Sequence, residues 1–232
     1  MALTRASRLK ACARVGAAAM TLLTSSVTVA EPMSKPLRVV YIEASTGRAW
    51  NLPQFPQRAS VRGVEFEFVA VYDFDKTAVV GKVLGSSVSK PDVVVLQECS
   101  AYFPGPLEEY KALYRGWVEQ IRQAGVRPVM VTTVPPAEPR GLVEWAKAFV
   151  KHRVLGRPSE HVQIVAFNDW VRVQGRELGV PVLDLEAAVR GDAENRWMNG
   201  EYDKGDGTHL NAAGYEVLDR TLKAFVADTL IR

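Results

Sequence analysis

The chain has 232 residues, of which 47% are hydrophobic and 24% charged, with 29 Lys and Arg against 26 Asp and Glu. This composition is ordinary for a folded globular protein and excludes an intrinsically disordered, collagen-like or coiled-coil chain. The length suits a single α/β domain. No stretch reaches the roughly 20 apolar residues that a membrane-spanning helix needs, so we expect no stable insertion into a membrane.

The first thirty residues have the pattern of a secretory signal peptide. They contain four basic residues and no acidic one, and the uncharged stretch from Val15 ends in small residues at Ala30. A basic start, a short apolar core and small residues before a cleavage site are the features of an export signal. We therefore expect a signal peptide at 1–30, a mature domain at 31–232, and a secreted or periplasmic protein. A disordered tail or an anchoring helix are the alternatives.

The chain without this signal is close to neutral. Removing its four basic residues leaves 25 basic residues against 26 acidic ones. Because there is also no run of Lys or Arg, the electrostatic footprint of a nucleic-acid-binding protein is missing, and we expect no nucleic-acid partner. Neither a His/Cys cluster with zinc spacing nor a glycine-rich phosphate loop is present, so we expect no metal and no cofactor.

Short β-rich runs alternate with longer helical segments along the chain. The β-rich runs predict five strands, at residues 37–42, 64–71, 92–96, 128–134 and 180–184. Apolar residues at three- and four-residue steps predict helices at 107–121 and 160–178 and from Asn211 onward, with Gly179 placed to end the second. This alternation predicts a parallel sheet with helices on both faces.

Polar residues follow the predicted strands at the points where a ligand site is expected. In open parallel sheets, ligands bind beyond the carboxyl ends of the strands. The residues there are Glu43–Thr46 after the first strand, Asp73 after the second and Gln97–Ser100 after the third. After the fifth strand comes a loop that contains Asp203, Asp206 and His209.

The segment from Asp206 to Tyr215 is the most informative part of the chain. An Asp three residues before a His, directly before a capped helix, can place a carboxylate beside an imidazole. Such a pair forms two-thirds of a nucleophilic triad, in which the Asp orients the His and the His deprotonates a hydroxyl. The third member is expected at the end of an early strand, where Ser45 is found.

The motif Asp206-Gly207-Thr208-His209-Leu210-Asn211, continued by Gly214-Tyr215, resembles the last sequence block of the SGNH/GDSL hydrolases. This resemblance implies a flavodoxin-like three-layer α/β/α sandwich with a parallel sheet of about five strands. It also implies ester hydrolysis with Ser45 as nucleophile, His209 as general base and Asp206 as the residue that orients it. A small-molecule or carbohydrate ester would be the substrate, and no cofactor would be required.

Two blocks depart from the family pattern. Glu43-Ala44-Ser45 stands where the family has Gly-Asp-Ser, and Gln97-Glu98-Cys99-Ser100 stands where it has Gly-x-Asn-Asp. The family's Asn donates to the oxyanion, so we expect Gln97 to replace it, with Ser100 as second choice. Removal of one such donor costs about 3–4 kcal/mol in the transition state. Glu43 is a candidate for substrate binding, although carboxylates near an oxyanion oppose it electrostatically.

Alternatives remain open at this stage. A non-catalytic ligand- or carbohydrate-binding protein on the same fold would explain both altered blocks. Ser45 would then be an ordinary turn serine and His209 a structural histidine. The other two histidines, His152 and His161, fall among surface-type residues of helical segments, and we expect them to be solvated.

Overall fold

The computed structural model describes residues 35–71, 75–86, 90–98, 107–150, 154, 156 and 159–231. The chain divides after Met33 into two units, and all described residues belong to the second, Ser34–Arg232. The predicted signal peptide and the candidate residues Asp73 and Ser100 lie outside the described residues.

A five-stranded sheet forms the centre of this unit, and all its strand pairs are parallel. The strand order is β2-β1-β3-β4-β5, which leaves β2 and β5 at the edges. Strands β1 and β3 are apolar throughout their centres because helices cover both faces of the sheet. The parallel five-stranded sheet expected from the sequence is thus confirmed. The strands are β1 (Leu37–Glu43), β2 (Val64–Ala70), β3 (Val93–Leu96), β4 (Arg127–Val131) and β5 (Val182–Leu183).

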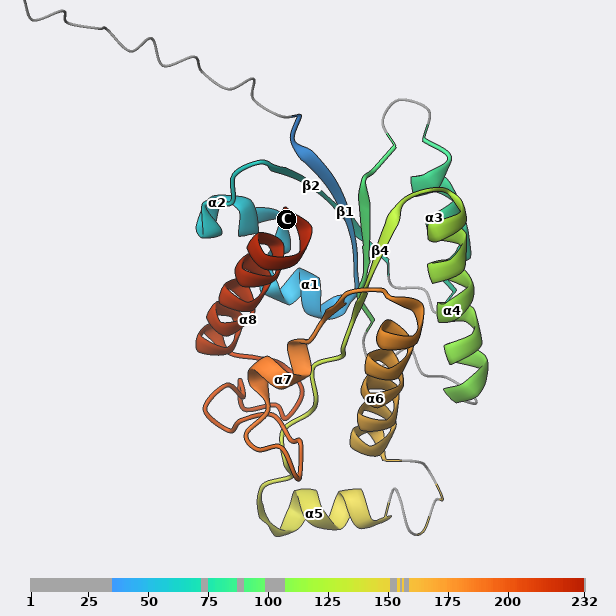
Figure 1. Cartoon of the computed structure of the whole chain (residues 1–232). Helices are drawn as coiled ribbons and strands as arrows, with labels where there is room; N and C mark the ends of the chain where they lie inside the picture. Colours follow the sequence, from blue (N-terminus) through green and yellow to red (C-terminus); the bar gives the residue numbers. More distant parts are fainter. Residues whose placement is uncertain are drawn as a thin grey trace, which may run out of the picture. The chain divides into compact units, whose positions relative to one another are not determined.

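Helices pack on both faces and produce three layers (Figure 1). Alternate residues of β1 serve two separate cores: Val39 and Tyr41 face one, Val40 and Ile42 the other. The first core is covered by α1 (Ser45–Trp50), η1 (Leu52–Gln54), α2 (Phe55–Ala59), α7 (Leu185–Val189), α8 (Ala212–Phe225) and η4 (Val226–Leu230). The second is covered by α3 (Thr77–Leu84), α4 (Leu107–Gln123) and α6 (Glu160–Leu178).

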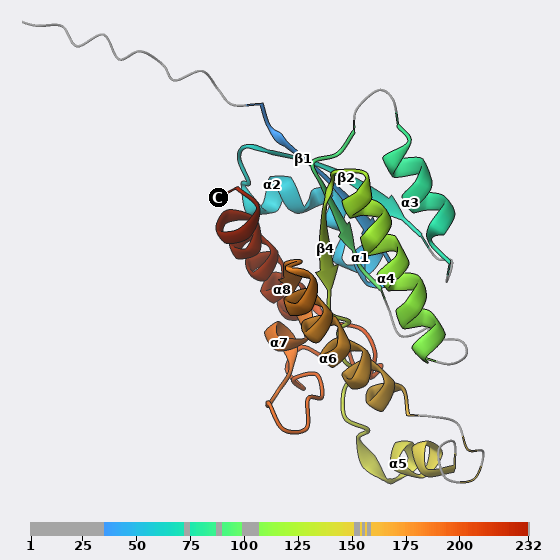
Figure 2. The same cartoon turned by 45° about the vertical axis from the view of Figure 1, so that its right-hand side comes forward.

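Helix α6 has the predicted bounds, α8 begins at the predicted cap, and α4 runs two residues past its predicted end at 121. Gly179 adopts a left-handed φ of 63° directly after α6 and ends it. The Asn211 side chain accepts a hydrogen bond from Gly214 N at 3.1 Å and caps the start of α8. Helix α5 (Gly141–Phe149) lies beyond the lower end of α6 in both views (Figure 1 and Figure 2).

The predicted fourth strand runs three residues past the observed end of β4. The strand ends at Val131. Thr132 N still donates to Leu183 O of β5 at 3.1 Å, whereas the Thr132 hydroxyl and the Thr133 N–H bind side chains. Thr132 Oγ1 donates to Asp184 at 2.9 Å, and Thr133 N donates to Asn168 Oδ1 at 2.7 Å. The chain therefore leaves the sheet at the end where the polar residues gather.

Candidate active site

The candidate site lies where the order of the strands reverses. From β1 the chain passes to β2 on one side, and then returns to β3 on the other side of β1. The crevice beyond the carboxyl ends of two such strands is the usual ligand site of open α/β sheets. Here Glu43 ends β1, Ser45 follows it, and Gln97 follows β3.

Ser45 is the first residue of α1 and is separated from the end of β1 by Ala44 alone. The preceding Ala44 has an extended backbone, and its carbonyl accepts a hydrogen bond from the Gly47 N–H at 3.0 Å. The chain therefore passes directly from the strand into the helix. A side chain at Gly47 would place its Cβ 2.6 Å from Glu43 Cβ and 2.9 Å from Leu52 Cδ1. Only glycine therefore allows this turn to close so tightly.

Asp206 and His209 form a pair before α8. The Nδ1 of His209 lies 2.9 Å from Asp206 Oδ2, while Asp206 Oδ1 accepts the backbone N–H groups of Thr208 at 3.0 Å and His209 at 2.8 Å. These bonds, the one from the His209 N–H foremost, lower the pKa of Asp206 to about 2. An ionised Asp206 keeps the proton of the imidazole on Nδ1, which leaves Nε2 to accept a proton. Both side chains are about half exposed.

A tight hairpin presents this pair. The Asp203 carboxylate accepts the N–H groups of Gly205 and Gly207, both of which have a left-handed φ. Lys204 N donates to His209 O at 2.9 Å and closes the hairpin. The Ala137 N–H, from the segment after β4, donates to Gly207 O at 2.9 Å and braces the hairpin from outside.

The element that begins at Ser45 and the helix that follows His209 are joined directly. Trp50 Nε1, at the end of α1, donates to Asp219 Oδ1 of α8 at 2.7 Å, and the Arg58 guanidinium binds the same carboxylate. Because α1 and α8 cover the same core, the predicted nucleophile and base come from one layer of the fold.

Gln97 and Glu43 are buried side by side. Gln97 N donates to Ile42 O, and the side chains of Gln97 and Glu43 are only 1% and 4% exposed. Gln97 Oε1 and Glu43 Oε2 have no hydrogen-bond partner among the described residues. Burial raises the pKa of Glu43. Either side chain can contact a substrate only if it first becomes accessible to solvent. The role of Gln97 as oxyanion donor and that of Glu43 in substrate binding therefore stay predictions.

The sequence interpretation missed a buried ion pair beside Gln97. Lys76 Nζ and Glu98 Oε1 lie 2.5 Å apart, and both side chains are completely buried. Burial raises the pKa of Glu98, and the charge of Lys76 opposes that rise. The backbone carbonyl of Glu98 accepts a hydrogen bond from Thr133 Oγ1, and this bond joins the segment after β3 to the segment after β4.

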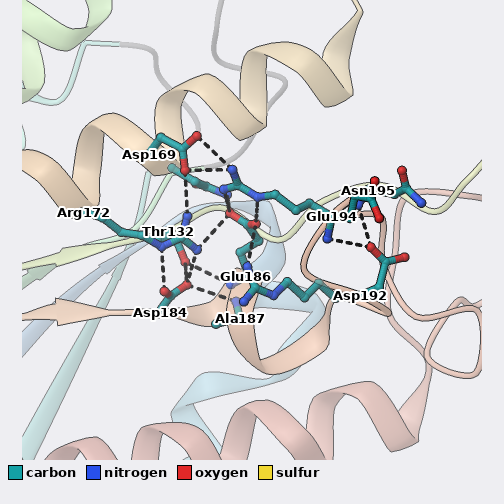
Figure 3. Close-up of polar contacts among 12 residues, drawn as sticks. Thr132, Asp169, Arg172, Asp184, Glu186, Ala187, Asp192, Glu194 and Asn195 are labelled. Carbon is teal, nitrogen blue, oxygen red and sulfur yellow. Dashed lines mark hydrogen bonds and ion pairs between the residues drawn. The ribbon is translucent and has the colours of Figure 1, made fainter.

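A second ionic cluster supports the loop that leads to His209 (Figure 3). Its centre is Glu186 of α7, which is fully buried and binds the guanidiniums of Arg196 and Arg172 and the amide of Asn168. Asp184 caps α7 and also binds Arg172. Since Arg196 belongs to the loop between α7 and α8, this cluster anchors that loop to α6 and α7. In the sequence these charges are spread from Asp169 to Arg196 and form no motif.

The expectation that His161 is solvated is wrong. Its imidazole is half-buried and stacks on Trp197, with ring centroids 3.6 Å apart and an interplanar angle of 13°. Burial lowers its pKa. The sequence could not reveal this contact because Trp197 lies in the irregular loop before α8. His152 lies outside the described residues.

A family model for GDSL-like lipases and acylhydrolases matches residues 75–217, more than half of the chain. The chain belongs to this family. Membership confirms the SGNH/GDSL resemblance and the enzyme class, a hydrolase of ester bonds. The match includes Gln97, Asp206 and His209 but begins after Ser45, so the choice of Ser45 depends on its position after β1.

Solved structures of similar fold are hydrolases of the same kind. A GDSL-like lipase from Bacteroides thetaiotaomicron superposes with a TM-score of 0.60 at 16% identity, over 86% of this chain and 92% of that one. An acetyl xylan esterase gives 0.57 at 14% identity, over 82% and 100%. The esterase EstA from a Pseudoalteromonas species gives 0.55 at 6% identity, over 84% and 99%. At these identities the likeness confirms the three-layer fold. No curated protein sequence matches the chain.

The described residues contain no group of three or more His, Cys, Asp or Glu side chains that could hold a metal ion. Within the same part of the chain, no helix has the length and apolar character to cross a bilayer.

Proposed function

We propose that the chain is an exported serine ester hydrolase with Ser45 as nucleophile, His209 as general base and Asp206 as the residue that orients it. The observation that carries the proposal is the Asp206–His209 pair, 2.9 Å apart, on the loop that precedes α8. A carboxylate bound to Nδ1 of an accessible imidazole supports base catalysis at Nε2. A plain structural histidine would not need this arrangement.

In the proposed reaction, His209 Nε2 takes the proton of Ser45 Oγ as the oxygen attacks the ester carbonyl. Asp206 stabilises the imidazolium that forms. The imidazolium then gives its proton to the departing alcohol, which leaves an acyl group on Ser45. A water molecule, deprotonated by His209, hydrolyses that acyl-enzyme and releases the acid.

The tetrahedral intermediate needs a donor for its oxyanion, and we propose the Gln97 amide. Gln97→Ala should lower kcat by roughly 10²-fold and leave KM nearly unchanged. Because Gln97 is buried, circular dichroism must show that the variant is folded. Gln123→Ala, an exposed amide at the end of α4, is the matched control and should have no effect. A wild-type kcat in Gln97→Ala would exclude Gln97 as a donor.

For the substrate we propose a small-molecule or carbohydrate ester with a short acyl group. The acetyl xylan esterase among the structures of similar fold makes acetylated sugars the first compounds to test. The second candidate, a non-catalytic binding protein, is favoured by the burial of Gln97, because a functioning oxyanion donor must reach the substrate.

A fluorophosphonate probe tests the nucleophile. Mass spectrometry of the labelled protein should find the phosphonate on Ser45, and Ser45→Ala should lose both labelling and ester hydrolysis. Ser60→Ala, an exposed serine after α2, should keep both. Label on another serine would contradict the assignment, and a folded protein without label or hydrolysis would favour the binding protein. Sequencing the amino terminus of the protein recovered from an exporting host tests cleavage near Ala30.

A further inference from the structure

Helix α5 has an exposed apolar face. Leu142, Trp145, Phe149 and Val150 are 87%, 61%, 48% and 47% exposed, and we call these four residues the α5 face. The rings of Trp145 and Phe149 stack at 5.5 Å and present one continuous surface. None of the four belongs to either core of the sheet. In both views α5 lies apart from the helices that cover the sheet (Figures 1 and 2).

The sequence around the α5 face is strongly basic. Residues 140–158 contain five Lys and Arg and a single acid, Glu144, whereas the rest of the predicted mature chain has 20 basic residues against 25 acidic ones. A segment with a charge of +4 is thus part of a domain whose remainder is acidic. Lys151, Arg153 and Arg157 lie outside the described residues, so their closeness to the α5 face is one of sequence. Aromatic and aliphatic side chains on one face of a helix, with Lys and Arg close in sequence, are the pattern of helices that lie in a membrane interface.

We propose that the α5 face binds the surface of an anionic phospholipid bilayer. The exposed rings would enter the boundary between headgroups and acyl chains, and the basic residues would be attracted to the anionic headgroups. A second copy of the chain fits less well. Two copies joined by this face would bring two segments of charge +4 together, and four side chains of one helix offer far less than the roughly 800 Å² per partner of a stable interface.

Binding at this face would bring the candidate site to the membrane. The Arg140 side chain, directly before α5, donates to Gly200 O at 3.1 Å, and Ala137 N binds Gly207 O at 2.9 Å. Both acceptors belong to the loop that carries His209. The segment directly before α5 is therefore hydrogen-bonded to that loop, and membrane binding by α5 would bring the loop toward the lipid surface. This inference does not depend on the proposed ester chemistry.

Co-sedimentation of the purified chain with vesicles tests the proposal. We expect binding to vesicles of equal parts phosphatidylglycerol and phosphatidylcholine, and little binding to phosphatidylcholine alone. Trp145→Ser/Phe149→Ser should lower the partition coefficient by about tenfold or more, and Lys151→Glu/Arg153→Glu should do the same. The matched controls should bind as the wild type does; they are Ile231→Ser, an equally exposed apolar residue at the far end of the chain, and Lys82→Glu on α3.

Three outcomes would overturn it. They are equal binding to neutral and anionic vesicles, no binding to either, and wild-type binding by the Trp145→Ser/Phe149→Ser variant. Analytical ultracentrifugation tests whether the α5 face instead joins two copies of the chain. A wild-type dimer that the Trp145→Ser/Phe149→Ser variant abolishes, without vesicle binding, would make the face a contact between copies. Circular dichroism confirms that each variant is folded, and because the readout is binding, loss of hydrolysis leaves the result interpretable.

Discussion

Replacement of Glu186 by Gln removes the charge at the centre of the ionic cluster. The wild-type carboxylate is fully buried and binds Arg196 at 2.5 and 2.8 Å and Arg172 at 3.0 Å. Breaking a buried ion pair costs about 3–5 kcal/mol, because the remaining charge loses its partner. In this variant Arg172 keeps Asp184 and Arg196 keeps Asp169, and 20% and 13% of these two arginine side chains are exposed to water, so part of the lost charge is compensated. We expect the lower end of that range, a loss of about 3 kcal/mol in the free energy of unfolding.

Urea unfolding followed by circular dichroism measures this loss, as a lower midpoint with an unchanged slope. Glu119→Gln, which removes an exposed carboxylate from α4, is the control and should change the free energy of unfolding by less than about 0.5 kcal/mol. A loss below about 1 kcal/mol in Glu186→Gln would refute the argument. It would mean that water and the remaining carboxylates, Asp169 and Asp184, already compensate these guanidiniums and that Glu186 does not stabilise the loop.

Three further predictions concern the site and its turn. His209→Ala should lower kcat by about 10²–10⁴-fold in ester hydrolysis, whereas His161→Ala should not; similar losses in both would indicate a stability effect. Because the folded pKa of Asp206 is about 2, against an ordinary 3.8, its carboxylate contributes stability above about pH 4 that is lost as the pH falls toward 2. Unfolding of wild type and Asp206→Asn should therefore differ most above pH 4 and converge near pH 2, and a constant difference would contradict this pKa. Gly47→Ala should destabilise by about 1–3 kcal/mol in urea, since its Cβ meets the buried glutamate that ends β1. Gly116→Ala, with open space on α4, should stabilise by up to about 1 kcal/mol, and equal effects would exclude crowding as the cause.

The sheet and the long helices could be predicted from the sequence because the local spacing of apolar residues indicates both. The strands are apolar runs, and α6 and α8 carry apolar stripes with a glycine or an asparagine at one end. The short helices α1, α2 and α7 were missed, since five or six residues give less than two turns of periodicity. The fourth strand was overextended because Thr132 and Thr133 favour strands, and only the Asn168 side chain, distant in sequence, binds the Thr133 N–H in place of a neighbouring strand.

The site was predictable in part for the same reason. Asp206 and His209 are three residues apart, so one hairpin brings them together and their pairing can be read from spacing. Lys76 and Glu98 are 22 residues apart and meet only because strand ends converge at one edge of the sheet. Glu186 and its arginine partners likewise depend on the packing of α6 and α7. Contacts of this kind follow from topology and leave no local pattern.

The two edges of the sheet bear on how the molecule avoids unwanted assembly. Along β2 the outward-facing residues are Glu65 and Glu67, whose side chains are 66% and 60% exposed. The other edge, β5, has only two residues and follows Pro181, which has no N–H to donate. Charged side chains, short length and proline each discourage the addition of a foreign strand. Growth of the sheet into filaments is therefore disfavoured at both edges, and an assembly of this chain would have to form through its helical faces.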